Sequence, residues 1–446
     1  MNFQNKKVLV VGLGINGGGV GSARFFAKQG AKVKVTDLKT KKELAPSLEK
    51  LRKFPIKYVL GQHRKKDFLE ADLIIRNPAV PINSPYLKLA RKAHIPIEME
   101  SSIFFRLFPP SKIIAITGTK GKTTTTHLIK NILQAAGQKV IMAGNFGVSL
   151  FDVLPKLKGK TRVVLEMSSW QLEGLEFCQL SPHIAVITNI YPDHLNRYPS
   201  MEAYVKAKEL IFKYQSQNDF LILNRDNPWT EKIKKHSQAK IKYFSYRDIT
   251  REIKDIYPPR GKHNLENLAA AIKVAELFKV SLPIIKKAIK NFHGVPNRLE
   301  MIREVKGIKF YNDTTATTPI AAQAAISSLS GPIIWILGGA EKNLPFDDLA
   351  KAAAKNKKIK AAIFLEGAAT KRLWQALKKA HTPFSFFGPF NNFNQAIKKA
   401  YSLAQKGDNI LLSPACASFG MFQNEFDRGE QFKTLVEKIA HEKKTQ

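Results

Sequence analysis

The stretch KIIAITGTKGKTTT, residues 112–125, decides the fold class of this chain. Its apolar half predicts a buried strand, and the glycines that follow predict a tight turn into a helix. Such a loop can present backbone N–H groups to phosphates, while Lys122 reaches the β- and γ-phosphates and the Thr123 hydroxyl binds Mg²⁺. Ile116 stands where the usual G-x-x-x-x-G-K-T motif has its first glycine. The stretch still predicts an ATP site.

Apolar runs alternate with amphipathic stretches on both sides of this loop, which is the pattern of parallel sheets covered by helices. We therefore expect an α/β chain of three domains: a Rossmann-like domain over 1–108, a P-loop-like ATPase domain with a mostly parallel sheet over 109–295, and a second Rossmann-like domain over 296–446. The predicted strands are KKVLVVG (6–12), KVKVTD (32–37), IKYVLG (56–61), DLIIR (72–76), IPIEME (95–100), KIIAIT (112–117), RVVLEM (162–167), HIAVITN (183–189), GIKFYND (307–313), PIIWILGG (332–339), KAAIFLEG (360–367) and DNILLSPA (408–415).

The composition excludes several classes of protein. The 72 Lys and Arg against 36 Asp and Glu give a net charge of +36. These cations are spread along the chain, so we expect a basic surface that favours anionic substrates and no dedicated nucleic-acid site. No apolar run approaches the roughly 20 residues of a membrane span, and we expect no signal peptide. The two cysteines, Cys178 and Cys416, have no metal-ligand spacing, which favours the reducing cytoplasm.

The first block carries glycines at 12, 14 and 17, directly after a strand, and Asp37 ends the next strand. This is the spacing of a dinucleotide fingerprint, in which glycines let a pyrophosphate approach a helix N-terminus. The alternative is a tight strand-to-helix turn, and further glycines at 18, 19 and 21 blur the motif. The pattern favours a phosphate-bearing ligand without specifying nicotinamide.

Acidic candidates follow two strands of the central block. Glu166 ends the strand RVVLE, and Asp193 and His194 follow the strand AVITN. Ligands of open α/β sheets collect outside the carboxyl ends of the strands, so these side chains should lie near the loop at 118–122. Mg²⁺ prefers hard oxygen ligands, which suits Glu166, whereas His194 is a less usual ligand.

Nine motifs are spread along the whole chain: TGTKGKTTT (117–125), EMSSWQLE (166–173), NIYPDHLNRY (189–198), YVKAKELIF (204–212), GKHNLENLAAA (261–271), PNRLE (296–300), FYNDTTATTP (310–319), LGGAEK (337–342) and SPACASFGMFQNEFDRG (413–429). These motifs resemble those of the Mur ligases, in the order found in that family. The resemblance implies a cytoplasmic step of peptidoglycan precursor synthesis, in which ATP phosphorylates the alanyl carboxylate of UDP-N-acetylmuramoyl-L-alanine and the amine of glutamate attacks the acyl phosphate.

The resemblance also implies roles for single residues. Lys122 stabilises transferred charge, Thr123 and Glu166 hold a first Mg²⁺, and His194 holds a second. Members of this type carry a carbamylated lysine near the second ion, and the family spacing selects Lys208 over Lys206. The implied ATP contacts are Gly118, Thr119, Lys120, Gly121, Lys122, Thr123, Thr124, Asn264, Asn267, Arg298 and Asp313, with Arg298 and Asp313 expected on opposite sides of a hinge so that ATP bridges the central and last domains.

The first domain, by the same resemblance, holds UDP rather than NAD. The implied contacts of the UDP-substrate are Gly14, Ile15, Asn16, Asp37, Leu38, Lys39, Asn77 and Asn145, and those of the amino acid are Thr315, Thr317, Lys342, Ser418 and Phe419.

One departure concerns the acceptor site. The family segment N-D-S-K-A-T reads NDTTAT here, at residues 312–317, so the neutral Thr315 stands in place of a lysine. Glu425 stands where an aromatic residue is frequent. These changes leave open D-glutamate, L-glutamate or another acidic amino acid as the acceptor.

Other functions explain less of the sequence. A folylpolyglutamate-synthase-like ligase shares the chemistry but not the GLGING and SPACASF motifs. A regulatory module without catalysis would not need Lys122, Glu166, His194 and Lys208 together. An NAD oxidoreductase leaves the ATP loop unexplained. We expect a monomer whose partners are its small-molecule substrates.

Overall fold

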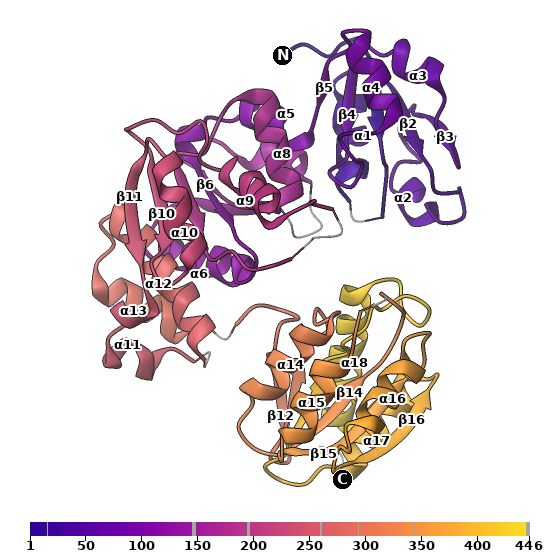
Figure 1. The fold of residues 1–446 in the computed structure, drawn as a ribbon, viewed down its shortest axis with the longest axis vertical. Coiled ribbons are helices and arrows are strands. Elements are labelled where there is room, and N and C mark those ends of the chain that lie inside the picture. The colour runs from indigo at the N-terminus through magenta and orange to yellow at the C-terminus, as the bar shows by residue number, and fades with distance from the viewer. Residues whose placement is uncertain are drawn as a thin grey trace. The chain divides into compact units, whose positions relative to one another are not determined.

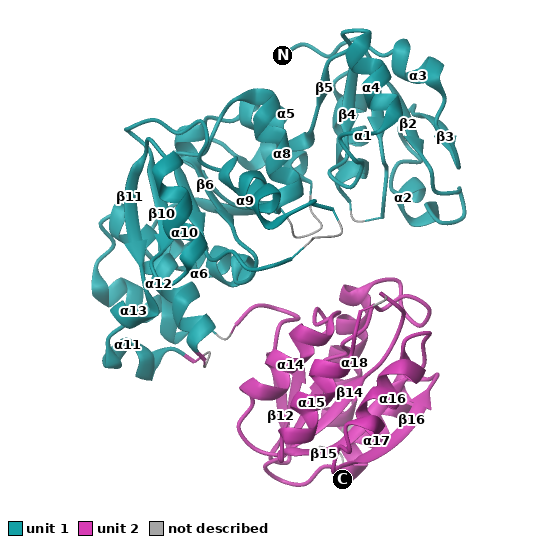
Figure 2. Cartoon of the chain, viewed as in Figure 1, with its two compact units in different colours: residues 1–257, 262–292 teal, residues 258–261, 293–446 magenta. Residues whose placement is uncertain are grey.

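The computed structural model describes residues 1–15, 17–144, 149–193, 197–258, 261–292, 294–342 and 344–442. Figure 1 shows three sheets, each with helices beside it. The chain forms two compact units (Figure 2): unit 1 is Met1–Tyr257 with Lys262–Phe292, and unit 2 is Pro258–Gly261 with His293–Gln446. The predicted α/β class with largely parallel sheets is confirmed.

The first sheet of unit 1 has the strand order β3-β2-β1-β4-β5 and is parallel throughout. Side chains alternate along β1, so that Val8 and Val10 enter one apolar core and Leu9 and Val11 enter the core on the opposite face. The elements are β1 (Lys7–Val11), α1 (Gly18–Lys28), β2 (Lys32–Asp37), α2 (Ala45–Glu49), β3 (Lys57–Leu60), α3 (Lys65–Leu69), β4 (Leu73–Arg76), α4 (Pro85–Lys92) and β5 (Ile97–Glu98).

The second sheet of unit 1 has the order β11-β10-β9-β6-β8-β7, again with parallel pairing. The strand that feeds the glycine loop, β6, lies between β8 and β9, so three loops meet at one edge. The elements are α5 (Glu100–Leu107), β6 (Ile113–Thr117), α6 (Lys122–Ala135), β7 (Val140–Gly144), α7 (Leu150–Val153), β8 (Arg162–Glu166), α8 (Ser169–Cys178), β9 (Ile184–Ile187), α9 (Met201–Glu209), β10 (Phe220–Asn224), α10 (Pro228–Ile233), β11 (Lys240–Phe244), α11 (Arg251–Ile256), α12 (Lys262–Leu277) and α13 (Leu282–Lys290), with short 3₁₀ turns η1 (Pro110–Lys112), η2 (Leu154–Lys156), η3 (Lys234–His236) and η4 (Tyr246–Asp248).

The two sheets of unit 1 are joined through helices α5 and α8. Gly174 on α8 permits this approach, because a Cβ there would lie 2.1 Å from the Ser101 hydroxyl oxygen. Ser101 donates a hydrogen bond to the carbonyl of Gln171 at 2.8 Å, and Arg24 pairs with Asp152 at 2.6 Å. The first and central predicted domains therefore pack as one compact unit.

Unit 2 contains the third sheet, with the order β12-β13-β17-β14-β15-β16. Only the β12–β13 pair of this sheet is antiparallel. Apolar cores cover both faces. The elements are β12 (Glu300–Val305), β13 (Ile308–Asn312), α14 (Pro319–Ser328), β14 (Ile333–Leu337), α15 (Asp347–Lys355), β15 (Ile359–Leu365), α16 (Thr370–Lys379), β16 (Ser385–Phe390), α17 (Phe393–Leu403), β17 (Asn409–Leu412) and α18 (Glu425–Glu442). Among the described residues, no helix combines the length and apolar composition that a membrane span requires.

Candidate functional site

The glycine loop between β6 and α6 has the shape that the sequence predicts. Gly121 precedes α6 with φ +85°, and a Cβ there would lie 2.1 Å from the Asn267 side-chain oxygen. Only glycine fits this left-handed and crowded position. Lys122, Thr123 and Thr124 form the first turn of α6 and are half-buried. The helix therefore points its N-terminal N–H groups and the Lys122 side chain toward the loop, as an anion site requires.

The loop is held by the segment that follows β9. The amide of Lys120 donates to the Asn189 side-chain oxygen at 2.9 Å, and the Thr188 hydroxyl donates to the Lys120 carbonyl at 2.6 Å. The Thr119 hydroxyl lies 3.2 Å from the carbonyl of Tyr191 and from the Tyr204 hydroxyl. These contacts fix the loop before any ligand binds.

Two lysine ammonium groups converge on one carbonyl of this loop. Lys208 on α9 donates to the Gly118 carbonyl at 2.9 Å, and Lys122 donates to the same oxygen at 3.1 Å. The Lys208 side chain is 1% exposed, and its ammonium lies 4.6 Å from the centre of the Tyr204 ring. Burial, and then the charge of Lys122, bring the pKa of Lys208 well below its usual value. Burial therefore favours the neutral amine of Lys208.

Carboxylate candidates lie beside the loop, at the ends of neighbouring strands. Glu166 ends β8 and is 1% exposed, and Asp193 lies 3.7 Å from the Lys120 ammonium. A hydroxyl and carboxylates are the hard oxygen donors that Mg²⁺ prefers, so the donor set fits that ion. His194 lies outside the described residues, and within those residues no three His, Cys, Asp or Glu side chains gather as a metal site.

Helix α12 brings the two predicted asparagines to the same region. Asn267 is 4% exposed, and its side-chain oxygen accepts a hydrogen bond from Thr125 at 3.4 Å. Asn264 is half-buried on the same helix, one turn earlier. Helix α12 packs along α6, so both asparagines are carried by a neighbour of the glycine loop.

The predicted UDP residues of the first sheet gather in a second place within unit 1. A cavity of about 790 Å³ lies at the carboxyl ends of β1, β2 and β4. Asn16 and Asn145 lie outside the described residues. The cavity is lined by six predicted residues, Gly14, Ile15, Asp37, Leu38, Lys39 and Asn77.

Asp37 shapes this cavity from within. Its carboxylate accepts hydrogen bonds from the backbone amides of Leu13 at 2.8 Å, Gly14 at 3.0 Å and Lys39 at 2.9 Å. The acidic end of β2 thus fastens the glycine turn of the first domain. A contact of Asp37 with uracil stays a prediction.

Sequence reasoning did not single out two rings of the same cavity. His63 lies 2.7 Å from the Thr36 hydroxyl, and its ring meets that of Tyr86 edge to face at 5.2 Å. Burial lowers the pKa of His63, which favours a neutral ring. A lone histidine between strands carries no signal of its own in the sequence, so only the fold identifies it.

In unit 2, the predicted nucleotide contacts Arg298 and Asp313 lie together. The backbone amide of Leu299 donates to the Asp313 carboxylate at 3.0 Å, and the Ser413 hydroxyl donates to its other oxygen at 2.8 Å. The expected hinge between Arg298 and Asp313 is wrong, because both belong to unit 2. The segment before β12, which carries Arg298, folds back onto the end of β13. The chain passes from unit 1 to unit 2 earlier, after Phe292. Burial raises the pKa of Asp313 to about 7.

The predicted amino-acid contacts also gather in unit 2. Lys342 donates to the Thr317 hydroxyl at 2.8 Å. Thr315 instead turns back, donating through its hydroxyl to the Asn297 carbonyl at 2.8 Å. Ser418 is 3% exposed, and its hydroxyl has no hydrogen-bond partner among the described residues. Phe419 is 51% exposed.

Arg428 is a buried cation of this region. It lies in the motif at 413–429, but the sequence indicates no role for it. It is fully buried, and its guanidinium donates to the Thr314 carbonyl at 2.9 Å and to the Thr314 hydroxyl at 3.0 Å. Burial lowers its pKa to about 10. Arg428 therefore anchors the loop that carries Thr315 and Thr317.

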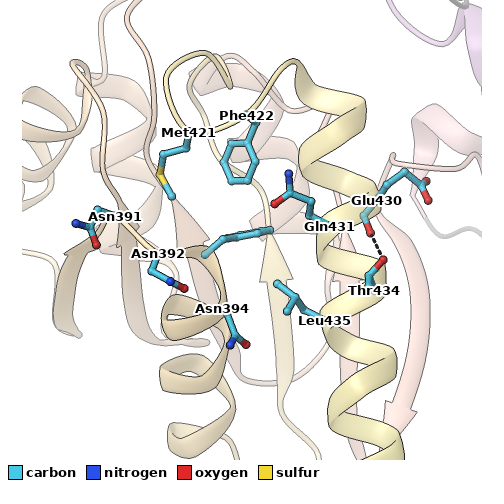
Figure 3. A pocket seen from close by; sticks show the side chains of 10 residues that line it. Asn391, Asn392, Asn394, Met421, Phe422, Glu430, Gln431, Thr434 and Leu435 are labelled. Carbon is cyan, nitrogen blue, oxygen red and sulfur yellow. Dashed lines mark hydrogen bonds between the residues drawn. The ribbon is translucent and has the colours of Figure 1, made fainter.

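A further cavity of unit 2, of about 550 Å³, contains none of the predicted site residues (Figure 3). Three asparagines near the start of α17 and side chains of α18 surround an aromatic pair, Phe393 and Phe422, whose rings meet edge to face at 4.9 Å. The Thr434 hydroxyl there donates to the carbonyl of Glu430 within its own helix.

Comparisons with known proteins agree along the chain. Family models match three parts of it: "Mur ligase MurD-like, N-terminal domain" over residues 6–98, "Mur ligase middle domain" over 116–258 and "Mur ligase, glutamate ligase domain" over 297–416. A UDP-N-acetylmuramoylalanine--D-glutamate ligase of Roseiflexus sp. (strain RS-1) is 44% identical over 99% of this chain and 100% of its own length. A ligase of the same name from Borreliella afzelii (strain PKo) is 37% identical over 98% of this chain and 99% of its own.

Solved structures share the fold at lower identity. The UDP-N-acetylmuramate-alanine ligase MurC of Thermotoga maritima aligns with a TM-score of 0.59 and 21% identity, covering 97% of this chain and 100% of its own. MurF of Acinetobacter baumannii aligns with a TM-score of 0.58 and 16% identity, covering 98% and 91%.

Proposed function

Because this chain belongs to the Mur ligase family, we propose that it uses ATP to join D-glutamate to UDP-N-acetylmuramoyl-L-alanine, a cytoplasmic step of peptidoglycan precursor synthesis. The observation that carries the proposal is the convergence of Lys122 and Lys208 on the Gly118 carbonyl, beside the buried Glu166. The Lys122 cation at the glycine loop suits a polyphosphate, and the Glu166 carboxylate at the end of the neighbouring strand suits its metal ion.

The reaction needs an activated carboxylate. A carboxylate is a poor acyl donor at neutral pH, and transfer of the γ-phosphoryl group from ATP to the alanyl carboxylate gives it a leaving group. The glutamate amine then attacks the acyl carbon, and phosphate leaves. Lys122 holds its charge next to the loop where the phosphoryl group passes, so it can stabilise the charge that develops during the transfer.

Metal binding in this proposal falls to Thr123, Glu166 and His194, with Lys208 completing a second of two sites. Mg²⁺, when bound, neutralises developing charge on phosphate oxygens. Lys208 would join as a carbamate: its neutral amine attacks carbon dioxide, an N–C bond forms and one proton leaves, so a cation becomes an anionic oxygen ligand. The lowered pKa and full burial of Lys208 support this choice over the exposed Lys206.

Substrate recognition is assigned to three sets of contacts. We place UDP in the 790 Å³ cavity of unit 1, where Asn77 and the glycine turn face the same space. We place the nucleotide at residues 118–124 with Asn264 and Asn267 in unit 1. Contacts of Arg298 and Asp313, in unit 2, with a nucleotide stay a prediction. We place the acceptor at Thr317, Lys342 and Ser418, with the neutral Thr315 and Phe419 nearby. The domain limits 1–108, 109–295 and 296–446 and a monomeric state are parts of the same proposal.

The test measures ADP release with each component left out in turn. We expect ADP only when Mg²⁺, UDP-N-acetylmuramoyl-L-alanine and D-glutamate are all present, and we expect Lys122→Ala to lower turnover by about 10²-fold, the usual effect of losing one preorganised charge. Turnover of NADH without any amide product would refute the proposal.

A further inference from the structure

A series of charged side chains, Arg76, Glu173 and Arg197, joins the two sheets of unit 1. Arg76, the last residue of β4, is fully buried. Its guanidinium donates to the Val80 carbonyl at 2.7 Å, to Glu173 on α8 at 2.7 Å and to the sulfur of Met99 at 2.9 Å. One cation thus reaches from the first sheet to a helix of the second.

Glu173 is shared with a second arginine. Its carboxylate accepts two hydrogen bonds from Arg197, each at 3.3 Å, and one from the Tyr198 hydroxyl at 3.3 Å. The Arg197 guanidinium in turn lies 4.3 Å from the centre of the Trp170 ring, which is on the same helix as Glu173. Glu173 therefore pairs with two arginines, Arg76 and Arg197.

The two ends of this series reach different candidate sites. At one end, Val80 lines the 790 Å³ cavity, as does Asn77, the residue directly after Arg76. At the other end, Tyr198 lies two residues before Ser200, whose hydroxyl caps helix α9 by accepting from the Ala203 amide at 3.2 Å. Helix α9 carries Lys208. The ion pairs of Arg76, Glu173 and Arg197 therefore connect the wall of the cavity to the segment that precedes helix α9, the helix that carries Lys208.

The chemistry of the junction explains why an ion pair matters more there than an apolar contact. Burying a guanidinium is unfavourable unless it is paired and hydrogen-bonded. Burial lowers the pKa of Arg76, and the Glu173 charge opposes that change. The hydrogen bonds of a guanidinium are directional, so Arg76 keeps the Val80 carbonyl and the Glu173 carboxylate at fixed mutual positions. Apolar side chains at this junction would allow the two elements to shift relative to each other, because apolar contacts are not directional.

We infer that Arg76 and Glu173 are positioning residues that couple the UDP-substrate cavity to the metal-binding side of the glycine loop. The inference rests on the proposed function, because it assigns the occupants of both sites. Binding of the UDP-substrate against Val80 and Asn77 holds Arg76, Arg76 holds Glu173, and Glu173 holds the segment that leads into α9.

The test compares Arg76→Met, Glu173→Gln and the double variant with the wild-type chain. For each protein, the rate of amide formation is followed against the concentration of UDP-N-acetylmuramoyl-L-alanine and, separately, against that of Mg²⁺. Glu176→Gln is the matched control, because Glu176 lies one turn further along α8 in an exposed pair with Lys213, and each of these two side chains is 49% exposed. Thermal melting verifies that each variant is folded.

We expect each single variant to raise both the KM for the UDP-substrate and the Mg²⁺ concentration at half-maximal rate by about fivefold to tenfold, a usual range for coupling between sites. In the double variant, neither constant should rise above its value in the more affected single variant, because both substitutions break the same series of ion pairs. Glu176→Gln should leave both constants unchanged.

A change in only one of the two constants, additive losses in the double variant, or no difference from Glu176→Gln would overturn the coupling while leaving the proposed function intact. If Arg76→Met does not fold, the nearly isosteric Glu173→Gln must move both constants by itself, and failure to do so overturns the inference. A wild-type chain that forms no amide would instead refute the proposed function, and the coupling with it.

Discussion

At the scale of the residue, two lysines on one helix show how position decides chemistry. Lys206 and Lys208 are two places apart on α9, so they point in different directions. Lys206 is exposed, whereas Lys208 is buried and donates to the glycine loop. The same side chain is a solvated cation in one place and a candidate for carbamylation in the other.

Replacing these lysines gives the first prediction. Lys208→Ala should be nearly inactive, because an anionic oxygen ligand is lost, and acetate should restore part of the rate. Lys206→Ala, the matched control, should keep near-normal turnover. We would measure steady-state rates with and without acetate. The mass of the intact wild-type chain would show whether one carbon dioxide has been added. An active Lys208→Ala variant and an unmodified wild-type lysine would contradict it.

Asp313 gives a prediction about pH and stability. Its folded pKa of about 7 lies above the usual value of 3.8, so the fold favours the protonated acid. Its contribution to the free energy of unfolding is complete below pH 4 and disappears as the pH rises through 7. Between pH 5 and pH 8 the contribution of Asp313 to the free energy of unfolding should fall by roughly 3 kcal/mol, since one pKa unit corresponds to about 1.4 kcal/mol.

Denaturant unfolding of wild type and Asp313→Asn at pH 5 and pH 8 measures this contribution. The variant keeps the shape of the side chain without its titration, so the difference between the two proteins should change by that amount. An unchanged difference would show that Asp313 titrates normally in the folded chain.

At the scale of the element, the sequence predicts strands well where apolar runs are bounded by turn residues. All twelve predicted strands are found. Five were not predicted: β7, β10, β11, β12 and β16. The edge strand β12 carries Glu300, Arg303 and Glu304 among its apolar residues, and β16 contains Gly388 and Pro389, which usually argue against a strand. A short run such as FLILN in β10 has no periodicity that separates it from a buried helix.

The site shows the same division. Residues within motifs, such as Lys122 and Gly14, could be predicted because their spacing belongs to a loop of known geometry. His63, Arg76 and the role of Arg428 could not, because their partners are distant in sequence; Arg76 and Glu173, for instance, are 97 positions apart. Only the packing of helices on sheets brings such pairs together.

The loop after β14 provides a prediction at this scale. Lys342 reaches from that loop to Thr317, before α14, and supplies a cation where Thr315 cannot. Lys342→Ala should raise the KM for glutamate about tenfold, since a charge-assisted hydrogen bond contributes about 1.5–3 kcal/mol, and should change the KM for ATP and kcat little. Lys351→Ala, an exposed lysine of α15, is the control. Equal effects of both variants on the glutamate KM would contradict the assignment.

At the scale of the whole molecule, the proposed sites are divided between the two units. Unit 1 carries the cavity assigned to UDP and the glycine loop, on two sheets that are joined through helices α5 and α8. Unit 2 carries the loop between β13 and α14, held by Arg428, together with Lys342 and Ser418. Each unit has its own apolar cores, so each can hold its proposed site without the packing of the other.

The central claim is that the chain is an ATP-dependent ligase for glutamate. The most direct measurement is the mass of the product formed from UDP-N-acetylmuramoyl-L-alanine, ATP and Mg²⁺ with a panel of D- and L-amino acids. We predict one amide, formed fastest with D-glutamate and with one ADP released per amide bond. Faster reaction with a neutral amino acid, or ADP release without an amide, would contradict it.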